Sequence, residues 1–169
     1  MTPRIILIGP PGAGKSSIGQ ALAQRLKLTF ADTDQLIEED QGKSVSDIFV
    51  DDGELYFREI EQSVCLSAFA HQSGVLALGG GAVLDIVTQR ELMKLNSSII
   101  FLDVSLKVVA PRIGFNRDRP LLLNNPRQKW QALMDIRRPV YVELATLCYD
   151  VEEKSVNEIV NELLNLVHI

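Results

Sequence analysis

The chain has 169 residues, of which 46% are hydrophobic, and a formal net charge of −5 at pH 7. This size suits one domain with a core that folds unaided, which excludes a disordered or fibrous protein. The acidic balance also argues against broad electrostatic binding to nucleic acid or to anionic membranes, so we expect neither as a partner.

Targeting signals are not evident in the sequence. No apolar run approaches the roughly 20 residues that a membrane-spanning helix needs, and the first run, residues 5–8, is too short for the core of a signal peptide. We therefore expect a cytoplasmic protein. The two cysteines, Cys65 and Cys148, form no closely spaced pair, and we expect both to be reduced packing residues rather than zinc ligands.

Short apolar runs alternate with longer stretches of helical period. The runs predict strands at residues 5–8, 28–31, 75–78, 99–102 and 147–151. Ile18, Leu22 and Leu26 recur every four residues and predict a helix, and Ser44 and Ser155 each open the spacing of a capping box. Parallel strands need crossover connections, so this alternation predicts a parallel sheet covered on both faces, a three-layer α/β/α domain.

The first predicted strand is followed by GPPGAGKS (residues 9–16), which matches the phosphate-binding pattern GxxxxGKS between a strand and an amphipathic helix. Glycines let the backbone curl so that successive N–H groups face a phosphate beside the positive end of the helix dipole. Lys15 is expected to reach the β- and γ-phosphates, and the Ser16 hydroxyl to ligate Mg²⁺. The alternative is a glycine-rich turn with a solvated lysine.

Two further motifs follow predicted strands, at the carboxyl edge of the sheet where the phosphate loop also lies. Asp32 and Asp34 of the DTD motif can divide two tasks. Asp32 is expected in the magnesium shell, and Asp34 as orienting group or general base for an acceptor hydroxyl. The alternative is that DTD only caps a helix beginning near Gln35. The triple glycine at residues 79–81 exposes backbone amides to a substrate, or forms an ordinary tight turn.

Arginines in two predicted helices are candidates for binding an anionic acceptor. Arg58 shares a helical face with Glu61, and the structural alternative pairs it with Glu61 or Glu54 on the surface. Later in the chain, at least one of Arg137 and Arg138 is expected to point inward. These cations could bind an anionic acceptor, because a guanidinium group can form two parallel hydrogen bonds with a carboxylate.

Residues 114–127 form the most irregular stretch, with three asparagines and two prolines. We interpret this stretch as a mobile flap between helices, because no repeat or Pro/Gly/Ser linker divides the chain. Residues 1–169 are therefore expected to form one domain. An arginine in such a flap, Arg119 among them, can swing over phosphates as the site closes.

Six motifs occur in one order: GPPGAGKS, DTD, GELYFREIE, GGGAV, RDRPLL and RRPVY. With these separations the chain resembles the shikimate kinase family from residue 5 to about residue 149. The resemblance implies a nucleoside-monophosphate-kinase-like fold with a five-stranded parallel sheet of order 2-3-1-4-5. It also implies a substrate-binding subdomain at about residues 33–61, a lid at about residues 112–126, and transfer of the γ-phosphoryl group of ATP to the 3-hydroxyl of shikimate, in the pathway to chorismate and the aromatic amino acids. We expect a monomer.

The resemblance also implies roles for single residues. Five residues are expected to bind shikimate: Asp34, Arg58, Gly80, Gly81 and Arg137. Arg137 is preferred to Arg138 because it keeps the family's spacing to Pro139. The arginines take the carboxylate, and Asp34 takes ring hydroxyls, including the one that attacks. ATP is expected on Gly12, Ala13, Gly14, Lys15, Ser16, Ser17, Arg112 and Arg119. The expected catalytic residues are Lys15, Asp34 and Arg119, and the expected magnesium ligands are Ser16 and Asp32. Arg112 stacks on one face of adenine, and the loop near Ser155 and Val156 covers the other.

Two other interpretations stay open. Another small-molecule P-loop kinase, for gluconate or a nucleoside monophosphate, would share the phosphate loop, and gluconate also carries a carboxylate. A nucleotide-dependent regulatory module would keep the loop after losing catalysis, but it would not be expected to keep all the catalytic residues named above. Measuring which acceptor supports the formation of ADP from ATP separates these possibilities.

Overall fold

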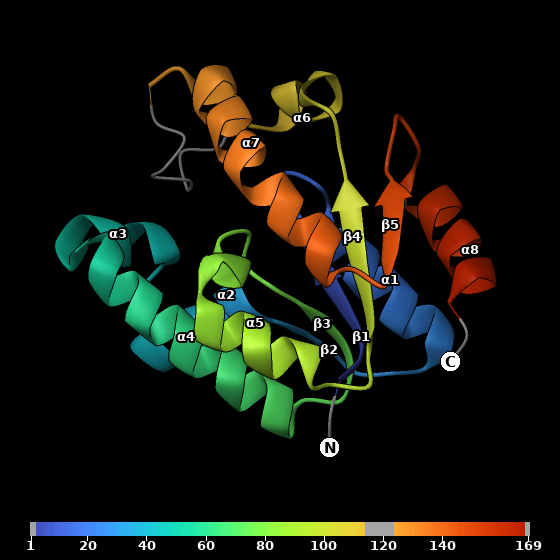
Figure 1. Ribbon diagram of the computed structural model, residues 1–169, viewed down its shortest axis with the longest axis horizontal. Coiled ribbons are helices and arrows are strands. Elements are labelled where there is room, and N and C mark those ends of the chain that lie inside the picture. The colour runs from blue at the N-terminus through green and yellow to red at the C-terminus, as the bar shows by residue number, and fades with distance from the viewer. Residues whose placement is uncertain (1–2, 114–123, 168–169) are drawn as a thin grey trace.

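The computed structural model describes residues 3–113 and 124–167 of the chain (Figure 1). Its strands are β1 (Pro3–Ile8), β2 (Phe30–Asp32), β3 (Gly74–Ala77), β4 (Ser98–Asp103) and β5 (Leu147–Asp150). Its helices are α1 (Lys15–Leu26), α2 (Thr33–Gln41), α3 (Val45–Asp51), α4 (Gly53–His71), the short 3₁₀ helix η1 (Ala82–Leu84), α5 (Ile86–Met93), α6 (Leu106–Ile113), α7 (Pro126–Leu144) and α8 (Val156–Leu166). Within these ranges no helix is both long and apolar enough to cross a bilayer.

The five strands form one parallel sheet in the order β2-β3-β1-β4-β5, which confirms the predicted order. β1 is central, and Ile6 lies between Leu76 of β3 and Ile99 of β4. Residues 5–8 are buried as a continuous apolar run, because a central parallel strand has both faces covered.

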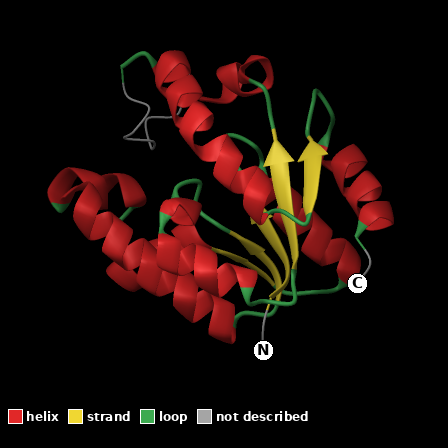
Figure 2. Ribbon diagram, in the orientation of Figure 1, coloured by secondary structure: helices red, strands yellow, loops and turns green. Residues whose placement is uncertain are grey.

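Helices cover both faces of this sheet (Figure 2). α1 and α8 pack together on one face, and α7 crosses β4 on the other (Figure 1). On the α7 side, α4, α5 and α7 all contact η1, which directly follows the triple glycine at the end of β3. The predicted three-layer architecture is therefore confirmed, and the carboxyl ends of β1, β2 and β3 lead into loops that share one edge.

A second, smaller apolar cluster lies apart from the main core. Ile37 of α2, Ile48 of α3 and Phe57 of α4 are buried against one another. Ser44 caps α3 by accepting a hydrogen bond from the Asp47 N–H, as its spacing predicts. This cluster fixes the start of α4 relative to α2, which is where the candidate residues of these two helices lie.

The second strand begins two residues later than predicted. Lys27 ends α1 in the left-handed region, with φ 56°, and the Leu28 N–H donates to the Ala23 carbonyl. Leu28 therefore belongs to the turn that leaves the helix. The strand then ends on Asp32, and α2 begins at once on Thr33 rather than near Gln35.

The prediction that both cysteines are packing residues is half correct. Cys65 of α4 is fully buried, but Cys148 is exposed. β5 is an edge strand, and its side chains alternate between the two faces. Tyr149 takes the buried position of that strand, so its neighbour Cys148 faces out.

Candidate active site

A cavity of about 590 Å³ lies at the carboxyl edge of the sheet. Its walls come from the phosphate loop, the β2–α2 junction, α4, the triple glycine, α6, α7 and the start of α8. Most predicted site residues line it: Gly12, Ala13, Gly14, Lys15, Ser16, Ser17, Asp32, Asp34, Arg58, Gly80, Gly81, Arg112 and Arg137. Arg119, the remaining prediction, lies outside the described residues, as does most of the expected lid. The tertiary structure thus brings together residues up to about 125 positions apart in the sequence.

The phosphate loop joins β1 to α1 in the way its sequence predicts. Gly14 has φ 90° and ψ 19° at the N-terminus of α1, a left-handed conformation that glycine adopts without steric cost. The Lys15 ammonium lies back over the loop and donates to the carbonyls of Gly9 (2.8 Å) and Pro10 (3.1 Å). These contacts hold a cation beside the first backbone N–H groups of a helix, which is a suitable arrangement for a phosphate.

Asp32 forms the helix cap that the sequence offered as an alternative, and it also contacts Ser16. Its Oδ1 accepts a hydrogen bond from the Asp34 N–H at 3.0 Å and so caps α2. Its Oδ2 accepts a hydrogen bond from the Ser16 hydroxyl at 2.5 Å. A hydroxyl and a carboxylate side by side at a phosphate loop are hard oxygen ligands, which is the donor set that Mg²⁺ prefers when the nucleotide supplies further oxygens.

Asp34 lies in the cavity wall between the phosphate loop and α4. Burial, followed by the nearby carboxylates of Asp32 and Glu61, raises the pKa of Asp34 from 3.8 to about 7, while Lys15 opposes the change. A carboxyl with this pKa exchanges its proton near neutral pH. It therefore suits a general base, whose pKa works best close to the operating pH.

Arg58 forms both pairs that the structural alternative predicted, but only the pair with Glu54 lies on the surface. Its guanidinium donates to Glu61 Oε2 at 2.6 Å and to Glu54 Oε1 at 3.3 Å. The Glu61 side chain is only 4% exposed, and burial raises its pKa even though Arg58 opposes this. The guanidinium also lies over the Phe57 ring at 5.3 Å. Arg58 is thus held in the cavity wall by a buried carboxylate.

Glu61 is a residue that the sequence analysis treated only as a surface partner. It lines the cavity beside Arg58, and its buried carboxylate also feels the charge of Arg137. The available signal was its place three residues after Arg58 in GELYFREIE. That spacing identifies neighbours on one helical face but does not say whether the face is buried.

The triple glycine forms a turn, in which the Ala82 N–H donates to the Gly79 carbonyl at 3.1 Å, and it also packs closely against charged side chains. A Cβ atom on Gly79 would lie 2.6 Å from Asp34 Oδ1 and 2.8 Å from Glu61 Oε1. A Cβ atom on Gly81 would overlap the Arg58 guanidinium. A side chain at Gly79 or Gly81 would therefore force the charged groups of the cavity to move.

Two neighbouring arginines of helix α7, Arg137 and Arg138, lie in different environments. Arg137 is buried and lines the cavity, and its Nε has no hydrogen-bond partner among the described residues. Arg138 is exposed and pairs with Asp103 at 2.6 Å. Nearer the N-terminus of the same helix, the Trp130 indole N–H donates to the Pro11 carbonyl at 2.8 Å and connects α7 to the phosphate loop.

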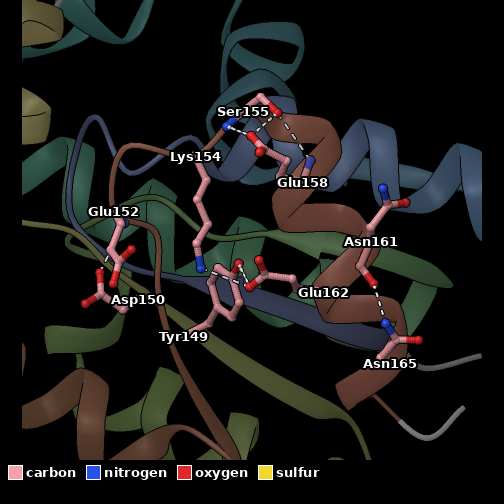
Figure 3. A network of polar contacts seen from close by, with 9 residues as sticks. All are labelled: Tyr149, Asp150, Glu152, Lys154, Ser155, Glu158, Asn161, Glu162 and Asn165. Atoms are coloured by element: carbon pink, nitrogen blue, oxygen red, sulfur yellow. Dashed lines mark hydrogen bonds and ion pairs between the residues drawn. The ribbon is translucent and has the colours of Figure 1, made fainter.

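The cavity extends past the phosphate loop to α6 and the loop before α8. Arg112 of α6 donates to the Gly12 carbonyl at 2.9 Å. On the α8 side the cavity is lined by residues that include Lys154 and Val156. The neighbouring Ser155 forms the predicted capping box with Glu158, so its hydroxyl is engaged by the helix (Figure 3). This leaves Val156 as an apolar surface where the base of a nucleotide is expected.

Lys154 is a second residue that sequence reasoning missed. Figure 3 shows its side chain reaching toward Tyr149 and Glu162 of the same network. Its ammonium pairs with Glu162 Oε2 at 2.9 Å and lies 5.3 Å from the centre of the Tyr149 ring. The Tyr149 hydroxyl donates to the same carboxylate oxygen at 2.7 Å. The network fixes the shape of the β5–α8 loop at this end of the cavity.

Comparison with known proteins identifies the family of this chain. The shikimate kinase family model matches residues 11–168. The shikimate kinase of Thermobifida fusca is 46% identical over 156 residues, which cover 92% of this chain and 90% of the relative, and that of Streptomyces coelicolor is 40% identical over 167 residues (99% and 96%). The solved structure of shikimate kinase from Acinetobacter baumannii in complex with shikimate matches with a TM-score of 0.93 and 32% identity, covering 98% of this chain and 93% of that one. The chain therefore belongs to the shikimate kinase family.

Proposed function

We propose that this protein transfers the γ-phosphoryl group of ATP to the 3-hydroxyl of shikimate, giving shikimate 3-phosphate and ADP in the pathway to chorismate and the aromatic amino acids. One observation carries the proposal: Asp34, Arg58 and Arg137 line the same cavity as the phosphate loop with Lys15. A base, two guanidinium groups for a carboxylate and a phosphate cage in one cavity match an acceptor that has both a hydroxyl and an acid group. The family membership and a relative solved with shikimate support the same substrate.

The chemistry follows from where charge develops. Phosphoryl transfer needs in-line placement of the reactants and cations near the equatorial oxygens of the phosphoryl group. Asp34 orients the attacking hydroxyl and takes its proton as the new O–P bond forms and the bond to the ADP oxygen breaks. Lys15 stabilises the β- and γ-phosphates, and Arg119 supplies a second cation from the lid. Arg58 and Arg137 hold the shikimate carboxylate.

The proposal includes Mg²⁺ held by the Ser16 hydroxyl and the Asp32 carboxylate together with the nucleotide. When bound, this ion neutralises charge on the β- and γ-phosphates. The hydrogen bond between Ser16 and Asp32 supports the assignment, because it brings the two oxygen ligands to one place. Asp32 keeps its capping bond to α2 through its other oxygen, which fixes the direction of the free carboxylate lone pairs.

The arrangement of the chain around the site is part of the same proposal. Residues 1–169 form one kinase domain, in which residues 33–61 act as the substrate-binding subdomain and residues 112–126 as the lid. The separate apolar cluster of Ile37, Ile48 and Phe57 supports the first of these assignments. The lid assignment rests on the resemblance of RDRPLL and on Arg112, which lines the cavity at the start of that segment. We further propose a cytoplasmic monomer. The net charge of −5 supports the absence of nucleic-acid and membrane partners.

A coupled assay for ADP tests the function directly. ADP formation from ATP is expected to require shikimate and to stop when a chelator removes Mg²⁺. Gluconate and a nucleoside monophosphate serve as competing acceptors, and neither is expected to replace shikimate. ATP binding without any shikimate-dependent ADP would instead favour a regulatory module, and activity with gluconate would favour the other kinase class.

A further inference from the structure

We propose that Tyr141 is a positioning residue for the acceptor. Its hydroxyl holds the carbonyl of Gly80, and this contact aims the N–H of Gly81 into the cavity as a hydrogen-bond donor for shikimate. The inference rests on the proposed function and extends it, because it assigns a role to the last residue of the RRPVY motif, which the mechanism above does not use.

Tyr141 is built into the core directly behind the acceptor side of the cavity. It is completely buried, and its ring stacks on Phe101 of β4 at 5.0 Å between ring centroids. Its hydroxyl donates to the Gly80 carbonyl at 2.5 Å. Tyr141 lies four residues after Arg137, about one helical turn, so both side chains project from the same face of α7 toward the triple glycine.

The peptide unit between Gly80 and Gly81 connects this contact to the cavity. In a trans peptide the carbonyl and the following N–H point in opposite directions, and the described residues contain no cis peptide bond. Because Tyr141 holds the Gly80 carbonyl on the core side, the Gly81 N–H points the other way. Gly81 lines the cavity beside Arg58, and no described residue accepts a hydrogen bond from its N–H. This donor is left for a ligand.

A triple glycine needs such an anchor. Glycine has the widest backbone freedom of any residue, so a peptide plane between two glycines can rotate at low cost unless something holds it. One end of the loop is fixed where the Gly79 N–H donates to Thr33 Oγ1 at 2.8 Å. The Gly79 carbonyl then accepts from the Ala82 N–H at 3.1 Å, and the Tyr141 hydroxyl holds the peptide unit between Gly80 and Gly81 inside that turn. Burial raises the pKa of Tyr141 to about 12, so this hydroxyl keeps its proton and remains a donor at neutral pH.

The variant Tyr141→Phe removes the hydroxyl and keeps the ring on Phe101. We expect the shikimate dissociation constant and the KM for shikimate to rise roughly tenfold, the scale of one hydrogen bond lost from a buried site. The KM for ATP is expected to change less than about twofold, because the phosphate loop keeps its own contacts. Tyr149→Phe is the matched control. It removes the hydroxyl of another buried tyrosine, which donates to Glu162 at 2.7 Å, and is expected to leave shikimate affinity unchanged.

Titration calorimetry with shikimate, steady-state kinetics for both substrates and thermal unfolding are measured on the wild type and the two variants. If the wild type forms no ADP with shikimate, the proposed function fails. If the wild type is active but Tyr141→Phe binds shikimate as tightly, the positioning role is wrong while the function stands. Equal losses of shikimate affinity in both variants would also overturn it, by showing a general effect of stability. If Tyr141→Phe is too unstable for calorimetry, the shift in Tm caused by shikimate at low starting temperature gives the same comparison.

Discussion

The carboxyl of Asp34 is the group whose replacement gives the sharpest test of the site. The variant Asp34→Asn keeps the shape of the side chain and removes its charge. In the wild type the ionised carboxylate is unfavourable, because Asp34 is desolvated in the cavity wall and faces Asp32 and Glu61. We expect the variant to be more stable than the wild type at pH 8 and to be far less active.

The magnitude follows from the pKa. A rise from 3.8 to about 7 corresponds to about 4 kcal/mol, at 1.36 kcal/mol for each pKa unit. We expect Asp34→Asn to recover about half of this, ~2 kcal/mol, because the new amide must itself be hydrogen-bonded in the wall. For a chain of this size, that gain raises Tm by roughly 4–8 °C.

The sign of the pH dependence is fixed by the same numbers. Between pH 4 and pH 7 the folded protein keeps a proton on Asp34 that the unfolded chain has lost. Wild-type stability therefore falls as pH rises through this window, and the fall ends above pH 7, where both states are ionised. The advantage of Asp34→Asn is expected to be largest at pH 8 and to shrink as pH falls toward 4.

Urea unfolding at pH 5 and pH 8 measures the stability difference, and the coupled ADP assay measures turnover, which is expected to fall at least ~10²-fold when the base is lost. Asp40→Asn, which removes an exposed carboxylate from the same helix, is the control and is expected to change neither quantity by much. A variant that is less stable than the wild type at pH 8, or a stability difference that does not depend on pH, would refute the conclusion that the ionised Asp34 carboxylate is destabilised in this cavity.

Three further substitutions test other parts of the site. Arg58→Ala is expected to raise the shikimate dissociation constant roughly 10- to 100-fold, because a carboxylate loses a charge-assisted partner, whereas Arg138→Ala, which removes only an exposed ion pair, is expected to leave it unchanged in the same titration. Arg119→Ala is expected to lower kcat roughly 10³-fold with little change in shikimate affinity, by analogy with arginine fingers. Glu162→Gln removes the charge that holds Lys154 and is expected to raise the KM for ATP only about two- to fivefold, because this partly exposed pair is screened by solvent.

For each of these substitutions, one result would contradict the expected effect. Unchanged shikimate binding in Arg58→Ala would mean that this arginine serves only its two glutamates. Normal turnover in Arg119→Ala would exclude it as the second phosphoryl-stabilising cation. A larger change in the KM for shikimate than for ATP in Glu162→Gln would mean that the β5–α8 loop contacts shikimate and not the nucleotide.

The sequence by itself was enough to determine the phosphate loop and a parallel sheet covered on both faces. GPPGAGKS is contiguous, and its function depends on its own backbone N–H groups and on the helix that follows directly. The order of the strands was implied only by the resemblance to the shikimate kinase family, and the structure confirmed it. Helix starts at Ser44 and Ser155 were also predictable, because a cap involves residues only three apart.

Tertiary structure decided what depends on burial and on partners distant in the chain. Arg137 and Arg138 are neighbours in sequence, and only the packing of α7 decides that the first lines the cavity while the second pairs with Asp103. The contact between Tyr141 and Gly80 joins residues 61 positions apart. Sequence spacing placed Glu61 beside Arg58 but left its exposure open, because desolvation is set by every element packed around a group, and local sequence specifies only one of them.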